Sequence, residues 1–268
     1  VIFAGLPDAF ESEGYDREHM GMPDCQNYLI QEILKVQKSV VVVLHNGSPV
    51  EMPWADDVSA ILEAYLCGQA VGAAEADILF GKVNPSGKLA ETIPYHLEDN
   101  PSYLNFPGDG QKVEYKEGVF VGYRYYDMKK MPVRYPFGYG LSYGDVQVEK
   151  AEFAKAPEKE QDAEICVTVK NYSEVATRDV VEVYIKNQDS KYAPVNPALC
   201  GFAKVSLGAG EEKELTITVS KEAYKVVNDE GEKIFDSSSS ILFIGTNGPD
   251  KRSEALTGKV TKQLVINW

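Results

Sequence analysis

The sequence predicts an α/β sheet followed by an antiparallel β-sandwich, and three observations support this fold class. Up to about residue 95, apolar runs typical of buried parallel strands alternate with segments of helical periodicity. From about residue 146, short stretches alternate apolar and polar residues with period two. Between them, residues 96–145 are rich in Pro, Gly and Tyr, which is typical of a functional or interdomain segment. We therefore expect domains at 1–95 and 146–268, joined by an irregular connecting segment at 96–145.

The first domain contains several apolar runs with the character of strands. The run at 39–44 is continuous and β-branched, which is typical of a parallel strand covered on both faces. The chain opens on a similar run at 1–4, a weaker run follows at 58–62, and we expect a short further strand at 89–93. These strands are too few for a complete α/β sheet. We therefore expect part of the domain to precede Val1.

Two segments between these strands have helical periodicity. Asp24, which follows Pro23, is a candidate N-cap. The apolar residues after it recur at helical spacing: Leu29, Ile30, Ile33 and Leu34. The second segment, 68–81, has glycine at either end. Its apolar face consists of Val71, Ala74 and Ile78. Strands that alternate with helices predict parallel pairing through right-handed crossovers.

The second domain contains three stretches in which apolar and polar residues alternate, as expected for strands with one buried face. Their apolar residues are Ile165, Val167 and Val169, then Val181, Val183 and Ile185, then Leu215, Ile217 and Val219. We expect a polar loop at 187–197 and a turn at the four serines 237–240. The last residues, 264–268, form an apolar ending that we expect to be exposed, and two alternatives stay open for it. It is either a docking strand or a cut into further sequence.

Composition limits the classes of partner. With 41 acidic and 27 basic residues, the formal net charge is −14, so no nucleic acid partner is expected. The apolar runs are far shorter than the about 18–20 residues of a membrane span, so no membrane partner is expected. The three histidines and four cysteines show no metal-binding spacing, and we expect neither a metal nor another cofactor. The cysteine pattern is typical of reduced, partly buried thiols in a cytoplasmic protein of bacterial type. Because the chain starts without Met, the lack of a leader carries no argument about export.

An acidic loop follows the first strand. Within residues 11–17 lie two glutamates, a glycine and an Asp-Arg pair. Open α/β sheets place their ligand chemistry at the carboxyl ends of strands. A Glu held there becomes a general acid if its surroundings raise its pKa. These seven residues alone favour the alternative of a solvated acidic loop.

Five motifs together resemble glycoside hydrolase family 3, the β-glucosidases and β-xylosidases. They occur in the family's order, and the resemblance extends from residue 1 to about 250. The motifs are SEGYDR at 12–17 before Met22-Pro23, NGSP at 46–49 before Trp54, NPSGKL at 84–89, GYRYYD at 122–127 and PFGYGLSY at 136–143. The resemblance implies an α/β-sandwich domain followed by a fibronectin-III-like, immunoglobulin-type sandwich.

The resemblance also implies a retaining β-glycosidase and assigns roles to residues of the acidic loop. The family's acid/base is typically a glutamate before Gly-Tyr-Asp-Arg, which here is Glu13, with Glu11 as the runner-up. Asp16 and Arg17 are expected to form an ion pair that fixes the loop. Tyr15 either stacks on a sugar of the substrate, a β-linked oligosaccharide or glycoside, or is a half-buried tyrosine of the loop.

Nothing in the chain resembles the family's (β/α)8 barrel, which carries the nucleophilic aspartate. Such a barrel needs about 250 residues. We therefore expect the barrel to be supplied in cis or in trans, and the chain alone to be inactive. The alternative is a non-catalytic carbohydrate-binding or scaffolding module derived from the same family. The tyrosines Tyr123, Tyr125 and Tyr126 are either a sugar platform or a packing ridge between the domains.

Overall fold

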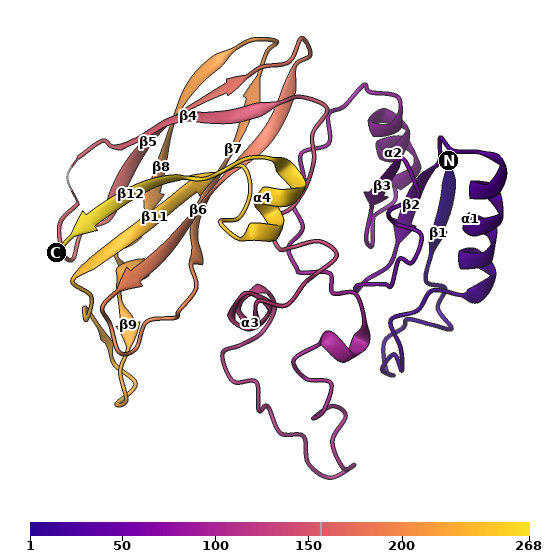
Figure 1. Ribbon diagram of the computed structural model, residues 1–268, viewed down its shortest axis with the longest axis horizontal. Coiled ribbons are helices and arrows are strands. Elements are labelled where there is room, and N and C mark those ends of the chain that lie inside the picture. Colours follow the sequence, from indigo (N-terminus) through magenta and orange to yellow (C-terminus); the bar gives the residue numbers. More distant parts are fainter. Residues whose placement is uncertain (156) are drawn as a thin grey trace. The chain divides into compact units, whose positions relative to one another are not determined.

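The computed structural model describes residues 1–155 and 157–268, which form two compact units. The first unit contains residues 1–83 and 93–117, and the second contains residues 84–92 and 118–268. The predicted connecting segment 96–145 thus contributes to both units. Each unit is described by itself, and Figure 1 shows the elements of both.

The first unit is built on a three-stranded parallel sheet in the order β1–β2–β3. The strands are β1 (Ile2–Gly5), β2 (Val41–His45) and β3 (Ala60–Glu63). The three residues at the middle of β2 are fully buried, because this strand is central: Val42, Val43 and Leu44. Successive residues of β2 point to opposite faces of the sheet, so the strand is buried on both faces, and this explains its continuous apolar run. The predicted parallel sheet is confirmed.

Two helices accompany this sheet, α1 (Asp24–Val36) and α2 (Val71–Leu79). Pro23 is the N-cap of α1, so Asp24 is its first residue and not the cap that the sequence predicts. Only part of the expected apolar face is buried, since Ile30 is 0% exposed whereas Leu29 is 49% exposed. The Gln26 side chain binds the backbone N and O of Gly5 at 2.8 and 2.9 Å, which fixes the start of α1 to the end of β1. The 3₁₀ turn η1 (Leu97–Asp99) completes the unit.

The expected strand at 89–93 is wrong. Residues 89–92 belong to the second unit and Ile93 to the first, and the segment is irregular, with one isolated bridge residue at Ile93. Leu89 exchanges backbone hydrogen bonds with the turn at 136–139, through Tyr139 O at 2.9 Å and Gly138 N at 2.8 Å. A turn offers no extended edge along which a ladder can continue, and this is the physical reason that no strand forms.

The second unit is a β-sandwich of two antiparallel sheets, with strand orders β12–β11–β6–β7 and β4–β5–β8. The period-two pattern of the sequence is confirmed, because the core lies between the sheets and takes the apolar residues of each alternation. The strands are β4 (Val146–Phe153), β5 (Ala163–Asn171), β6 (Thr177–Gln188), β7 (Ala198–Leu207), β8 (Glu212–Val219), β11 (Ser239–Gly245) and β12 (Lys262–Asn267).

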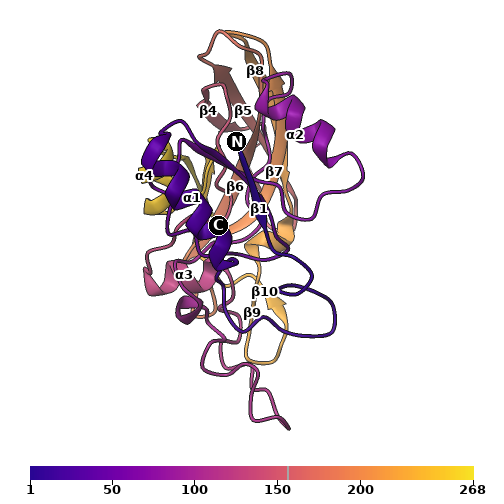
Figure 2. The same ribbon diagram turned by 90° about the vertical axis from the view of Figure 1, so that its right-hand side faces the viewer.

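Short elements decorate this sandwich. A small hairpin of β9 (Val226–Val227) and β10 (Lys233–Ile234) projects beyond the end of the sandwich, as Figures 1 and 2 show. It follows the 3₁₀ turn η2 (Lys221–Tyr224). Two short helices, α3 (Tyr123–Lys129) and α4 (Lys251–Thr257), are absent from the sequence-based expectation. Each has seven residues, which is too short for a clear periodic signal.

The C-terminal residues form an integral strand of the sandwich, so the expectation of an exposed ending that serves as a docking strand is wrong. β12 pairs antiparallel with β11 along its whole length. The Trp268 ring packs edge-on against Tyr224 at 4.9 Å between centroids, and its Nε1 donates to Ser240 Oγ at 3.1 Å. Ser239 and Ser240 belong to β11 and not to a turn. The buried Ser240 hydroxyl is tolerated in the strand because it donates to Asn187 Oδ1 at 2.7 Å.

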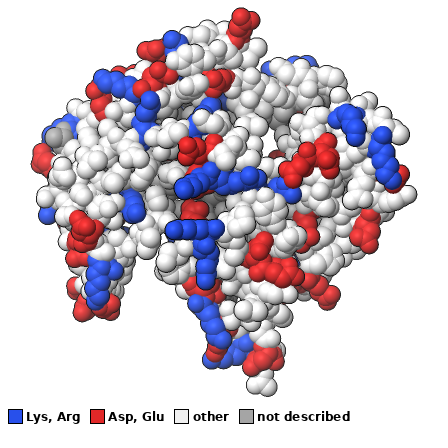
Figure 3. Space-filling view, in the orientation of Figure 1, with Lys and Arg blue, Asp and Glu red and all other residues white. Residues whose placement is uncertain are grey.

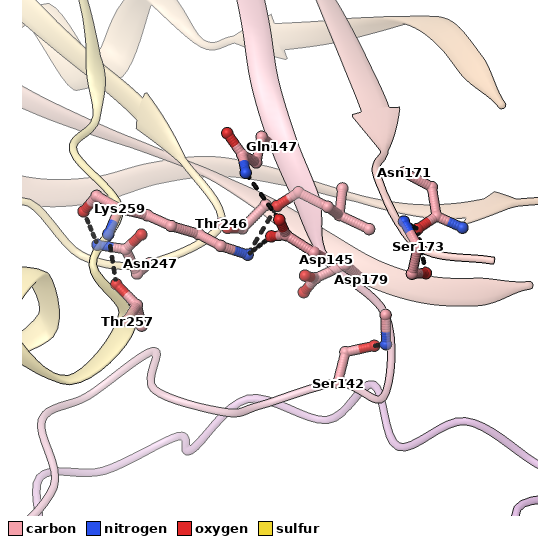
Figure 4. Close-up of polar contacts among 12 residues, drawn as sticks. Ser142, Asp145, Gln147, Asn171, Ser173, Asp179, Thr246, Asn247, Thr257 and Lys259 are labelled. Carbon is pink, nitrogen blue, oxygen red and sulfur yellow. Dashed lines mark hydrogen bonds and ion pairs between the residues drawn. The ribbon is translucent and has the colours of Figure 1, made fainter. Parts of the chain in front are cut away.

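Polar contacts close the end of the sandwich near the start of β4. Figure 4 shows Lys259 reaching Asp145, with its Nζ 3.2 Å from Asp145 Oδ1. The same Nζ donates to the Val146 carbonyl at 2.8 Å. The backbone carbonyl of Lys259 accepts from Asn247 Nδ2 at 3.3 Å (Figure 4). These contacts link the segment after α4 to the first strand of the opposite sheet.

Candidate active site

The candidate site lies at the carboxyl ends of β1 and β2, where two loops begin side by side. In the parallel register Gly5 is opposite His45, and Leu6 N donates to the His45 carbonyl at 2.8 Å. A Cβ at Gly5 would lie 2.0 Å from that carbonyl oxygen, so this close approach of the two strand ends requires glycine. The acidic loop after β1 therefore meets the loop after β2.

Glu11 is bound into this junction. Its carboxylate accepts from Gly47 N at 2.5 Å and from Ser48 Oγ at 2.7 Å. Arg17 Nη1 lies 3.8 Å from the same carboxylate. With these three partners, the Glu11 side chain is engaged in holding the two loops together.

Arg17, at the other end of the acidic loop, also binds the loop after β2. Its Nη1 donates to Ser48 Oγ at 2.7 Å and to the Pro49 carbonyl at 3.1 Å. Burial lowers the pKa of Arg17, and the charge of Glu11 partly offsets that effect. The predicted Asp16–Arg17 ion pair is wrong: among the described residues Arg17 pairs with Glu11. Asp16 is exposed, whereas the Arg17 side chain turns inward and is 14% exposed.

Asn46 extends this polar junction toward β3. Its Nδ2 donates to the Ser48 carbonyl at 3.0 Å and lies 3.5 Å from Glu63 Oε2. Within the described part of the chain, Asn46 Oδ1 and Arg17 Nη2 are buried without a hydrogen-bond partner. Buried polar atoms normally have a partner, so both atoms are available to ordered water.

Glu13 and Tyr15 occupy the exposed part of the acidic loop. Glu13 is exposed and has no side-chain hydrogen bond or ion pair with any described residue. Gly14, which follows it, has a φ of +96°, a left-handed conformation that suits glycine. Tyr15 is 48% exposed, and its hydroxyl donates to the Asp8 carbonyl. Its ring is thus half exposed while its hydroxyl is tied to the loop itself, and both interpretations of Tyr15 stay predictions.

The histidines and cysteines lie apart from one another. His45 Nε2 is 2.9 Å from the buried Glu75, His96 Nδ1 is 3.7 Å from Glu51, and the His19 ring packs against Phe10. Among residues 1–155 and 157–268, no three His, Cys, Asp or Glu side chains are grouped as metal ligands. All four cysteines are free thiols, and Cys25 and Cys67 are more exposed than the partly buried thiols that the sequence predicts.

A second group of ionisable residues, in the β-sandwich unit, was missed by sequence reasoning. Burial raises the pKa of Asp127 to about 7, and the nearby negative charge of Asp250 adds to this. Burial also raises the pKa of Glu182 to about 7. The hydrogen bond from Tyr184 at 2.9 Å and the charge of Lys88 lower this pKa, but burial outweighs them. Glu182 lies at an outward position of the β6 alternation, so only its covering by other segments of the unit buries it.

The space beside this group is small. It is lined by Tyr123, Asp127, Phe137, Tyr184 and Asp250, among others, and its cavity volume is about 10 Å³. A volume of this size holds about one water molecule and no sugar ring. Tyr123 stacks on Phe137 at 4.7 Å, and its hydroxyl accepts from Leu199 N at 3.1 Å. Tyr123 is therefore part of the packing of its own unit.

Family comparison identifies the class of protein that carries this fold and this loop. Residues 1–143 match the glycosyl hydrolase family 3 C-terminal domain, and residues 179–247 match a fibronectin type III-like domain. The chain therefore belongs to glycosyl hydrolase family 3. The predicted family and fold class are confirmed.

Individual relatives are β-glucosidases and a related glycosidase. The chain is 48% identical over 278 residues to thermostable β-glucosidase B of Acetivibrio thermocellus, covering 100% of this chain and 36% of that protein. It is 44% identical to an exo-α-(1→6)-L-arabinopyranosidase of Bifidobacterium longum, covering 84% and 30%. The structure of a Bifidobacterium adolescentis family 3 β-glucosidase matches with a TM-score of 0.90 at 40% identity, covering 99% and 38%. The chain thus spans about a third of the length of these relatives.

On the face that Figure 3 shows, basic and acidic side chains are interspersed. No helix within the described residues has the length and apolar character needed to cross a bilayer.

Proposed function

We propose that this chain is the acid/base-bearing C-terminal portion of a retaining β-glycosidase of the β-glucosidase type, and that Glu13 is its general acid/base. The substrates are oligosaccharides or glycosides with a terminal β-linked sugar. Family membership supports the reaction class, and the relatives' names support the substrate class.

The contrast between the two glutamates of the acidic loop carries the residue assignment. Glu11 is engaged by Gly47, Ser48 and Arg17, so its carboxylate is not free to exchange a proton with a substrate. Glu13 is exposed and lies between two residues that are anchored. A general acid must reach the leaving oxygen within hydrogen-bond distance, and an unengaged carboxylate on a fixed loop meets that requirement.

The proposed mechanism needs a second carboxylate from outside this chain. In a retaining glycosidase the nucleophile stands about 5–5.5 Å from the acid/base, on the other side of the scissile bond. Glu13 gives its proton to the leaving aglycone while the nucleophile forms the glycosyl-enzyme. It then takes a proton from the water that hydrolyses this intermediate.

The nucleophile is supplied by a (β/α)8 barrel domain, in cis or in trans, so the chain alone is inactive. Tyr15 offers a ring for stacking on the substrate sugar, and no nucleic acid or membrane takes part. A cytoplasmic location accompanies this proposal.

The test uses the complete polypeptide encoded by the gene and the variants Glu13→Gln and Glu18→Gln. Glu18 is an exposed glutamate of the same loop and serves as the matched control. Loss of general acid catalysis should lower kcat/KM on alkyl glycosides by ~10²–10⁴ for the Glu13 variant. Aryl glycosides with good leaving groups should be affected less, because they need little protonation. Equal rates for both variants and the wild type on both substrates would favour the non-catalytic module instead.

A further inference from the structure

Ser48 joins the two ends of the loop that carries Glu13. Its hydroxyl donates to Glu11 Oε1 at 2.7 Å and accepts from Arg17 Nη1 at 2.7 Å. A serine hydroxyl has one hydrogen, so donation to Glu11 leaves its lone pairs for Arg17. The result is a directional chain from Arg17 through Ser48 to Glu11. Glu13 lies between the two anchored residues in the sequence.

The surroundings make this chain of contacts stiff. The side chains of Arg17 and Glu11 are 14% and 22% exposed, so water competes weakly for their hydrogen bonds. A Cβ at Gly47 would lie 3.1 Å from the Glu11 carboxyl atoms, so glycine at this position lets the carboxylate pack closely against the backbone. The second half of the loop is also tied back, through the Tyr15 hydroxyl on the Asp8 carbonyl.

We propose that Ser48, together with Glu11 and Arg17, positions Glu13 for proton transfer; this inference rests on the proposed function of Glu13. None of the three residues needs to touch the substrate. They hold the backbone on both sides of Glu13, so that its carboxylate stays within reach of the leaving oxygen. Proton transfer depends steeply on this distance, and a displacement of about 1 Å can cost about 10²-fold in rate.

The test compares Ser48→Ala with Ser48→Thr and with Ser39→Ala in the complete polypeptide. Thr keeps the hydroxyl, and Ser39 is an exposed serine that serves as the matched control. We expect Ser48→Ala to lower kcat about 10–100-fold on alkyl glycosides. KM should change less than about 3-fold, because the Tyr15 hydroxyl keeps its own bond to the Asp8 carbonyl without Ser48. Ser48→Thr should recover most of the loss. The alkaline limb of the kcat–pH profile should also shift, since a displaced Glu13 has a different environment.

A folding defect is separated from a positioning defect by assaying well below the unfolding midpoint of each variant. If Ser48→Ala lowers the unfolding temperature but keeps the wild-type kcat and pH profile, the three residues have only a structural role and the inference is wrong. Glu11→Gln is a second test of the positioning role that does not depend on a change at Ser48. It should lower kcat in the same way, without rescue by azide, because the Glu13 carboxylate still occupies its place.

The inference and the proposed function can fail separately. If Glu13→Ala is rescued by azide while Ser48→Ala and Glu11→Gln behave as wild type, the function stands and the positioning role is overturned. If azide rescues Glu11→Ala and not Glu13→Ala, then Glu11 is the acid/base, and both are overturned. Loss on Ser48→Ala with no loss on Glu13→Gln also overturns both, since the network would then position some other group.

Discussion

Lys88 Nζ lies 2.9 Å from Asp179 Oδ1, and the two side chains are only 10% and 5% exposed. The same ammonium donates to the carbonyls of Gly140 and Thr246 at 2.8 and 2.9 Å. One lysine thus binds the segment 84–92 to three acceptors, of which Asp179 and Thr246 are buried residues of the sandwich and Gly140 is partly buried. Both charges are out of water, so each depends on the other.

Removal of this ammonium should strongly destabilise the second unit. We expect Lys88→Met to cost about 3–5 kcal/mol in the free energy of unfolding, because Asp179 is left buried without its counter-charge. Urea unfolding monitored by circular dichroism measures this cost. The matched control is Lys82→Met, because Lys82 pairs with Asp77 at 3.1 Å at the surface. That change should cost at most about 1 kcal/mol, and equal costs for both variants would contradict the account.

The stability of the second unit should fall as pH rises toward 7. Asp127 has an ordinary carboxyl pKa of 3.8 when unfolded and about 7 when folded, so the folded state binds more protons between these values. Each step up in pH within this window therefore favours unfolding, and the effect ends above about pH 7. Glu182 acts in the same direction.

Asp127→Asn tests this pH dependence, because the amide stays neutral throughout. The variant should gain unfolding temperature relative to the wild type at pH 8 and not at pH 4, as measured by thermal scans across this range. The exposed Asp57→Asn serves as control. A constant difference between Asp127→Asn and wild type at every pH would show that Asp127 does not titrate in this window.

The parallel sheet could be predicted from the residues, because β2 is buried on both faces and its sequence is continuous and β-branched. The contacts of Ser48 could not be predicted from the sequence. They depend on the register that places Gly5 opposite His45, and no local pattern encodes a contact between residues 37 positions apart. The burial of Glu182 was equally hidden, since its position in β6 is that of an outward polar residue. Sequence motifs singled out the acidic loop, but the structure was needed to separate the engaged Glu11 from the exposed Glu13.

The close approach of β1 and β2 depends on Gly5. We expect Gly5→Ala to destabilise the first unit by about 1–3 kcal/mol or more, because its Cβ would lie 2.0 Å from the His45 carbonyl oxygen. Gly72→Ala is the matched control: the residue is inside α2, and apart from its chain neighbours and the backbone of its own helix no atom lies within 4 Å of an added Cβ. Alanine there should stabilise by about 0.5–1 kcal/mol. Opposite signs in urea unfolding are the expected result, and equal effects would refute the close contact.

Trp268 should contribute to the stability of the sandwich. Its ring packs against Tyr224 and Phe235 at centroid distances of 4.9 and 5.7 Å. We expect Trp268→Ala to cost about 2–3 kcal/mol, which is below the cost for a fully buried Trp because the side chain is partly exposed. Urea unfolding measures this value. A cost near zero would mean that the tail does not pack as a strand of this sheet.

The role of Glu13 is tested most directly by azide rescue of Glu13→Ala in the complete polypeptide. Removing the side chain leaves space beside the glycosyl-enzyme, and azide can attack there without base catalysis. With an activated aryl β-glucoside, turnover should rise with azide concentration and the product should be the β-glycosyl azide, identified by NMR. Glu11→Ala and Glu18→Ala should yield no such product. Formation of the azide product by Glu11→Ala in place of Glu13→Ala, or by neither variant, would contradict the assignment of Glu13 as the acid/base.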